Sequence, residues 1–213
     1  MPSSVPGTVV NDRCWPSGGG VVVVIVLVVV GSFRDGMARA ALAPLAACPA
    51  PSTSRFENQA TPFESLYHTI GEAYPERHRY LADAMWSDEP AAEVLAAIRE
   101  HVARAPSARS HVLCALLPPM PLPDGALSMT ARLYVASYAG WSAPADDVAN
   151  ADWHRSVTDA LTPFAMGYYG GESDVIGDAA RARRCFAPAA RARLVGVRRA
   201  YDPAGMFHGV LND

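Results

Sequence analysis

Apolar and other residues alternate along the chain from Leu127 to Tyr138. The apolar series is Leu127, Met129, Ala131, Leu133 and Val135, and the intervening series is Ser128, Thr130, Arg132, Tyr134, Ala136 and Tyr138. Because successive side chains of a strand point to opposite faces, this pattern predicts a strand with one face against a core. The other face is rich in hydroxyl groups and either faces solvent or lines a pocket. The pattern alone favours solvent, since antiparallel sheets commonly have one wet face.

The apolar run from Val21 to Val30 predicts a central strand. It has about half the length that a membrane-spanning helix needs, and its β-branched residues suit a strand buried on both faces. Leu45–Cys48 resembles a lipoprotein cleavage box. However, Arg34, Asp35 and Arg39 separate it from the apolar run, where a signal sequence would be uncharged. We therefore expect a cytoplasmic protein that does not enter the membrane.

The remaining patterns predict a mixture of helices and strands. Apolar stripes and start signals predict helices at 36–47, 61–70, 88–106, 145–161 and 189–199, and strands at 110–117 and 164–169. Strict alternation of strand and helix is absent, which favours an α+β fold with a mostly antiparallel sheet and helices packed on one face. Residues 1–20 contain three prolines and four glycines and are predicted to be a disordered lead-in to a single domain at 21–213.

Composition excludes several classes of chemistry. All 18 basic residues among the 213 are arginine, so a lysine Schiff base and a phosphate-loop lysine are excluded. The net charge of -3 gives no general attraction to nucleic acid or anionic membranes. Seven arginines lie between Arg181 and Arg199, but acidic residues flank them and only Phe186 interleaves with them, which favours a solvated helix face.

No spacing in the sequence indicates a metal site or a hydrolase. The four cysteines lie far apart without a C-x-x-C pair, and the six histidines are scattered. A G-x-S-x-G motif is also absent. We expect isolated buried thiols and no bound metal.

The C-terminal segment carries a family resemblance. Arg193–Pro203, with its Tyr-Asp-Pro ending and the following Met206-Phe207, resembles the end of FAD-linked oxidases of the berberine bridge enzyme-like family. Gly167–Tyr169 resembles the family's Y-x-N segment, and the strand and helix before it are similar as well. The resemblance covers roughly residues 21 to 210, with the berberine-like segment at 164–213.

This resemblance implies an antiparallel sheet, backed by helices, whose open face covers the isoalloxazine ring of FAD. It implies a small-molecule alcohol or amine substrate, which loses a hydride to the flavin before oxygen reoxidises the cofactor. The implied residues are Tyr168 as catalytic base, Arg132, Tyr134 and Tyr138 as substrate contacts, and Tyr169, Gly170 and Asn212 at the cofactor. A tyrosine base must have a lowered pKa or lose its proton as the hydride leaves.

The family's flavin-binding half precedes its substrate domain, and residues 1–20 do not resemble it. Gly18–Gly20 lacks the flanking strand and helix of a phosphate site. We therefore expect the substrate-binding half of an oxidase, whose start is misassigned or which works with a separate FAD-binding chain. A non-catalytic ligand-binding module is the alternative, because Gly170 and Gly205 replace family asparagines; an unstable gene product is a third.

Overall fold

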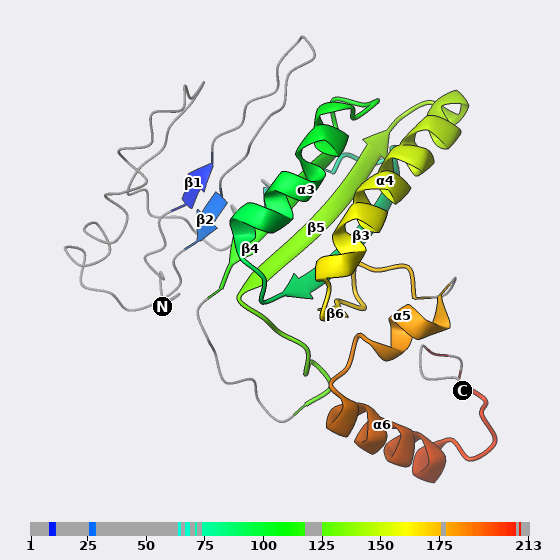
Figure 1. The fold of residues 1–213 in the computed structure, drawn as a ribbon. Coiled ribbons are helices and arrows are strands. Elements are labelled where there is room, and N and C mark those ends of the chain that lie inside the picture. The colour runs from blue at the N-terminus through cyan, green and yellow to red at the C-terminus, as the bar shows by residue number, and fades with distance from the viewer. Residues whose placement is uncertain are drawn as a thin grey trace, which may run out of the picture. The chain divides into compact units, whose positions relative to one another are not determined.

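The computed structural model describes residues 9–11, 26–28, 64, 67–68, 71, 74–117, 125–175, 178–207 and 209. The chain divides into two compact units, residues 1–78 and residues 79–213 (Figure 1). Each unit is described by itself below.

In the first unit, the described strands are β1 (Val9–Asn11) and β2 (Val26–Val28), which pair antiparallel with Val10 opposite Leu27. β2 lies within the predicted valine strand, and β1 lies within residues 1–20, where the sequence pattern predicts no element. Residues 64, 67 and 68 are helical, within the predicted helix at 61–70, and residue 71 is helical just beyond it. The predicted helix at 36–47 lies outside the described residues.

The second unit contains a four-stranded sheet in the order β4-β5-β3-β6. Its strands are β3 (Arg79–Ser87), β4 (His111–Leu116), β5 (Leu133–Trp141) and β6 (Gly167–Tyr168). Every neighbouring pair is antiparallel. The predicted α+β class with an antiparallel sheet is therefore confirmed.

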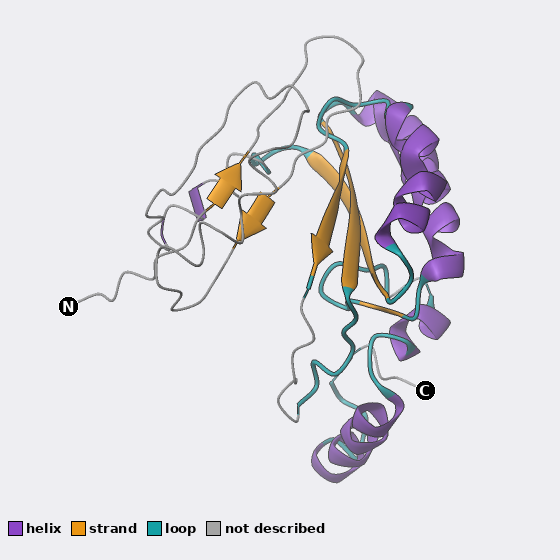
Figure 2. Cartoon of the chain, turned by 60° about the vertical axis from the view of Figure 1, so that its left-hand side comes forward, coloured by secondary structure: helices purple, strands orange, loops and turns teal. Residues whose placement is uncertain are grey.

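Helices α3 (Ala91–Ala103) and α4 (Asp147–Leu161) pack on the same face of this sheet (Figure 2). Short 3-10 turns at Pro144–Asp146 and Thr162–Phe164 flank α4. Helices α5 (Ala179–Arg183) and α6 (Pro188–Tyr201) complete the chain. The predicted helices at 88–106, 145–161 and 189–199 correspond to α3, α4 and α6. No helix in the described part of the chain combines the length and hydrophobicity needed to cross a bilayer.

The hydrophobic core lies between the sheet and helices α3 and α4. One side of β5 supplies buried Leu133, Val135, Ala139 and Trp141, while α3 and α4 supply Val94, Ile98, Trp153, Val157 and Leu161. Full burial of one such side chain stabilises the fold by about 1.5–3 kcal/mol. The predicted alternation is thus confirmed from residue 133 onward, and the strand starts six residues later than predicted because its partner β4 ends at Leu116.

Candidate functional site

The sheet face opposite the helices carries the second side-chain series of β5. Residues paired directly across an antiparallel ladder point to the same face, so Trp86 of β3 lies beside Tyr134, and His111 of β4 lies beside Tyr138. The Trp86 and Tyr134 rings are 4.7 Å apart between centroids, and the His111 and Tyr138 rings stack at 5.1 Å. Tyr169 meets Tyr134 edge-on at 6.4 Å.

A carboxylate lies among these rings. The hydroxyl groups of Tyr134 and Tyr138 both donate to Oε2 of Glu172, the latter at 2.7 Å. We call the set of Trp86, His111, Tyr134, Tyr138, Tyr169 and Glu172 the tyrosine face. Two of its members, Tyr134 and Tyr138, are predicted substrate contacts, and the structure brings them together on one carboxylate oxygen.

Hydrogen bonds to the backbone of β3 hold the loop that carries Glu172. The amide of Tyr169 donates to the carbonyl of Ala84 at 3.3 Å, and the Ser173 hydroxyl donates to the same carbonyl at 2.9 Å. Between them, the amide of Glu172 donates to the carbonyl of Tyr169 at 3.0 Å and closes a turn. A Cβ atom at Gly171 would lie 2.9 Å from the ring of Tyr169, so glycine there allows this ring to keep its place.

The environment of Tyr134 keeps its hydroxyl group protonated. Burial is the main cause that raises its pKa above the ordinary tyrosine value, and the hydrogen bond to Glu172 and the charge of that carboxylate add to it. Tyr134 is therefore a hydrogen-bond donor rather than a base in this structure.

Tyr168 lies on the opposite side of the sheet from the tyrosine face. It pairs with Met85, belongs to the core between sheet and helices, and has 5% of its surface exposed. The guanidinium carbons of Arg181 and Arg184 lie 4.3 and 4.9 Å from its ring centroid. Nη1 of Arg184 donates to the hydroxyl oxygen at 3.4 Å. The structure therefore separates Tyr168 from Tyr134 and Tyr138, and its catalytic role stays a prediction.

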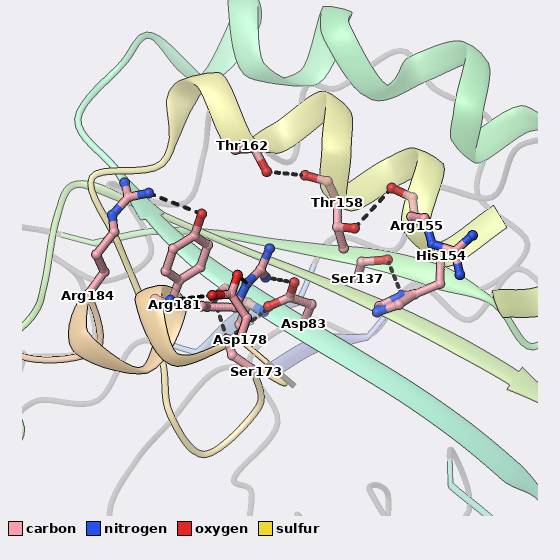
Figure 3. Close-up of polar contacts among 12 residues, drawn as sticks. Asp83, Ser137, His154, Arg155, Thr158, Thr162, Ser173, Asp178, Arg181 and Arg184 are labelled. Atoms are coloured by element: carbon pink, nitrogen blue, oxygen red, sulfur yellow. Dashed lines mark hydrogen bonds and ion pairs between the residues drawn. The ribbon is translucent and has the colours of Figure 1, made fainter. Parts of the chain in front are cut away.

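Figure 3 shows a polar cluster that includes Asp83, Asp178 and Arg181. Arg181 links this cluster to Tyr168, over whose ring its guanidinium lies. Asp83 of β3 forms a buried ion pair with Arg181 of α5. Asp178 begins α5 by accepting the backbone N–H groups of Ala180 and Arg181 at 2.9 and 3.0 Å. These contacts attach the C-terminal segment to the sheet.

Arg132 also lies apart from the tyrosine face. Its side chain donates to the carbonyl of Asp88 and forms an ion pair with that carboxylate at 3.6 Å. It lines a cavity of about 460 Å³ at the start of β5, together with Glu89, Pro90, Ala91, Leu116, Leu117 and Leu133. The predicted substrate contact is therefore held at one end of the sheet.

The remaining predicted cofactor residues lie in different places. Tyr169 belongs to the tyrosine face, Gly170 is exposed in the following turn, and Asn212 lies outside the described residues. The sequence gives no signal for Glu172 beyond its place after a Gly-Gly turn, and Trp86 and His111 enter the site only through strand pairing.

The Tyr-Asp-Pro motif closes a turn after α6. The Asp202 carboxylate accepts the amides of Met206 at 2.7 Å and Phe207 at 3.0 Å. Gly205 has a φ of 65° within this turn, in the left-handed region that favours glycine. The motif therefore has a structural role at the end of α6.

Comparison of the sequence with protein-family models and with curated proteins finds no match. Solved structures do match. The 6-hydroxy-D-nicotine oxidase of Arthrobacter nicotinovorans superposes with a TM-score of 0.70 and 18% identity, over 98% of this chain and 47% of that one. CrmK, a flavoenzyme of caerulomycin biosynthesis, superposes with a TM-score of 0.65 and 17% identity, over 83% of this chain and 41% of CrmK. BBE-like 1 of Physcomitrella patens superposes with a TM-score of 0.62 and 11% identity, over 85% of this chain and 43% of that one.

The chain shares its fold with part of each of these three proteins. It spans less than half the length of each of these three proteins. The likeness supports the sequence resemblance to FAD-linked oxidases at the level of the fold.

The tyrosine face fits the ring of a flavin better than the N-termini of α3, α4 and α5 fit its phosphates. Its aromatic side chains suit a planar ring, and the buried Nε1 of Trp86, which has no hydrogen-bond partner among the described residues, is a donor suited to a ring carbonyl. The N-termini of α3 and α4 carry Glu93 and Asp147 in their first turns, and Asp178 occupies that of α5. Acidic residues there disfavour a pyrophosphate.

Proposed function

We propose that this chain forms the substrate-binding part of an FAD-dependent oxidoreductase. The observation that carries the proposal is the match of 98% of the chain to 47% of an oxidase. The aromatic and polar side chains of the tyrosine face support it, since they form a wall of the kind that orients a small molecule. In this proposal the tyrosine face covers the substrate side of the isoalloxazine ring.

The proposed reaction removes a hydride from a carbon that bears an alcohol or amine group. The C–H bond breaks, a proton leaves the adjacent oxygen or nitrogen, and a C=O or C=N bond forms. FAD, when bound, accepts the hydride and is later reoxidised by oxygen. The chain's own residues orient the substrate, and Glu172 is the carboxylate on this face that can accept the released proton.

In this proposal the phosphates of FAD are held by residues outside the N-termini of α3, α4 and α5. Acidic residues at the starts of α3, α4 and α5 support this assignment. In the proposal a separate FAD-binding chain, or a further segment of the same protein, provides the phosphate site. The cofactor would then lie between that part and the tyrosine face.

A non-catalytic ligand-binding module is the second candidate. Glycine at 170 and 205 in place of the family's asparagines favours it, because these side chains are absent from the positions where the resemblance expects them. Such a module would bind a small molecule on the tyrosine face without redox chemistry.

Anaerobic bleaching of the flavin absorption band distinguishes the two candidates. The chain is mixed with excess FAD and with each member of a panel of alcohols and amines. Because weakly held flavin exchanges with free FAD, repeated turnover reduces the whole FAD pool and bleaches its absorption band. An oxidoreductase bleaches the band with at least one member of the panel, and heat-denatured chain does not. A folded chain that binds a panel member without bleaching the flavin acts as a ligand-binding module when it is alone, and addition of the flavin-binding part then decides whether the band bleaches.

A further inference from the structure

Two of the three tyrosine hydroxyl groups of the tyrosine face donate to one carboxylate oxygen. Tyr134 and Tyr138 lie on the same face of β5, and the hydroxyl group of each donates to Oε2 of Glu172. An ionised carboxylate accepts hydrogen bonds at both oxygens and donates none. The second oxygen, Oε1, receives no hydrogen bond from any described residue, so it is able to accept one from a ligand.

No described cation neutralises this carboxylate. None of the ion pairs formed within the described residues includes Glu172. Arg132 pairs with Asp88 at the end of the sheet, and Arg181 pairs with Asp83 on the helix side. Groups of three or more His, Cys, Asp or Glu residues suited to a metal ion are likewise absent from the described part.

Aromatic faces surround the carboxylate. The ring of Trp86 lies 4.7 Å from that of Tyr134, at a tilt of 53°, and Tyr169 meets the same tyrosine edge-on. Aromatic π faces attract cations, as does a half-buried carboxylate. An anion would be repelled by Glu172, and a neutral hydroxyl group would gain one ordinary hydrogen bond.

We infer that Glu172, oriented by Tyr134 and Tyr138, recognises a protonated amine. This inference rests on the proposed function and narrows its substrate class from alcohols or amines to amines. The ammonium group donates to Glu172, and the apolar part of the ligand lies against Trp86 and Tyr169. Glu172 is thus the residue that determines specificity on this face.

The test compares benzylamine, which is protonated at neutral pH, with benzyl alcohol, which has nearly the same size without charge. The indole N–H signal of Trp86 in a ¹H–¹⁵N NMR spectrum reports binding, and its absence in Trp86→Phe identifies it. Benzylamine shifts this signal saturably, with a dissociation constant about tenfold or more below that of the alcohol, as expected when a hydrogen bond gains charge.

Glu172→Gln keeps the size of the side chain and removes its charge. We expect this variant to bind the two probes within about twofold of each other, while Glu93→Gln, a matched charge change on exposed α3, keeps the preference for the amine. If Glu172→Gln does not fold, Glu172→Ala is the second variant, and the NMR spectrum reports folding for both.

Three results would overturn the inference. They are equal affinities in the unaltered protein, a preference that persists without the Glu172 carboxylate, and no shift with either probe up to about 10 mM. The measurement contains no flavin, so it separates the two proposals. Amine selectivity without flavin reduction leaves the binding site in place and removes the oxidoreductase function of the chain by itself.

Discussion

The guanidinium group of Arg181 lies over the ring of Tyr168, with 4.3 Å between its carbon and the ring centroid. Arg184 approaches the same ring and donates to its hydroxyl oxygen at 3.4 Å. Tyr168 is thereby enclosed on the helix side of the sheet, where it packs in the core. This placement favours a structural role for the residue that the family resemblance implies as a base.

Substitution of Tyr168 tests that role. Tyr168→Phe keeps the ring and its cation–π contacts and loses one hydrogen bond, so we expect a stability loss of about 1 kcal/mol. Tyr168→Ala removes the ring and should cost about 3–5 kcal/mol. Urea denaturation measures both values. A Tyr168→Ala variant as stable as the Phe variant contradicts the packing, and loss of flavin reduction in a stable Phe variant would instead indicate catalysis.

The ion pair between Asp83 and Arg181 should respond asymmetrically to substitution. Asp83→Ala leaves the largely buried guanidinium of Arg181 with only the longer 3.9 Å contact to Asp178, and should destabilise the protein by about 3–5 kcal/mol. Addition of Arg181→Met to this variant should restore part of the loss, because no unpaired charge remains. A double-mutant cycle by chemical denaturation measures the coupling. Additive losses would show that the two side chains do not interact.

Much of the second unit's fold could be predicted from the sequence, and β3 shows where this stops. β5 is recognisable because its core-facing side is apolar in alternate positions. In β3 the core-facing side includes Asp83 and Ser87 beside Met85, so the side that packs in the core shows no apolar series. The partner that makes Asp83 tolerable there, Arg181, lies 98 positions later in the sequence. Local pattern carries no information about such a pairing.

Tyr134 should make the protein less stable in strongly alkaline solution. Its folded pKa is raised above the ordinary value of 10.0, mainly by burial and further by Glu172. Above that pH the unfolded chain loses this proton while the native protein keeps it, so stability falls as pH rises. Denaturation between about pH 9 and pH 11 should give a steeper decline for the unaltered protein than for Tyr134→Phe. Equal slopes would contradict the burial of this hydroxyl, and Tyr201→Phe at an exposed site is the matched control.

His154 should have the opposite effect in mildly acidic solution. Burial lowers its pKa below 6.5, and its Nδ1 lies 3.2 Å from the hydroxyl oxygen of Ser137. Below pH 6.5 the unfolded chain therefore binds a proton that the native protein does not, and stability falls as pH decreases. Between about pH 8 and pH 5, the free energy of unfolding measured by denaturation should fall less for His154→Gln than for the unaltered protein. His68→Gln, at an exposed position, should lose as much unfolding free energy between these pH values as the unaltered protein does. An equally large loss in His154→Gln would contradict the account.

The candidate site was only partly accessible from the sequence. The alternation that places Tyr134 and Tyr138 on one face follows from strand geometry. Glu172 belongs to a loop, and its position depends on the backbone bonds between residues 169–173 and Ala84. Tyr168 and Tyr169 are adjacent in sequence, and the pairing of Tyr168 with Met85 decides which of them reaches the tyrosine face.

A fluorescence titration of riboflavin and FAD tests the central claim, that the tyrosine face covers a flavin ring. Tyrosine and tryptophan quench flavin fluorescence on stacking, so the account predicts saturable quenching of both flavins. Their midpoints should agree within about threefold if the phosphates contribute little here. Trp86→Ala should weaken the quenching, whereas Trp141→Phe on the helix side should not. The absence of saturable quenching with either flavin, in a folded chain, would contradict the claim.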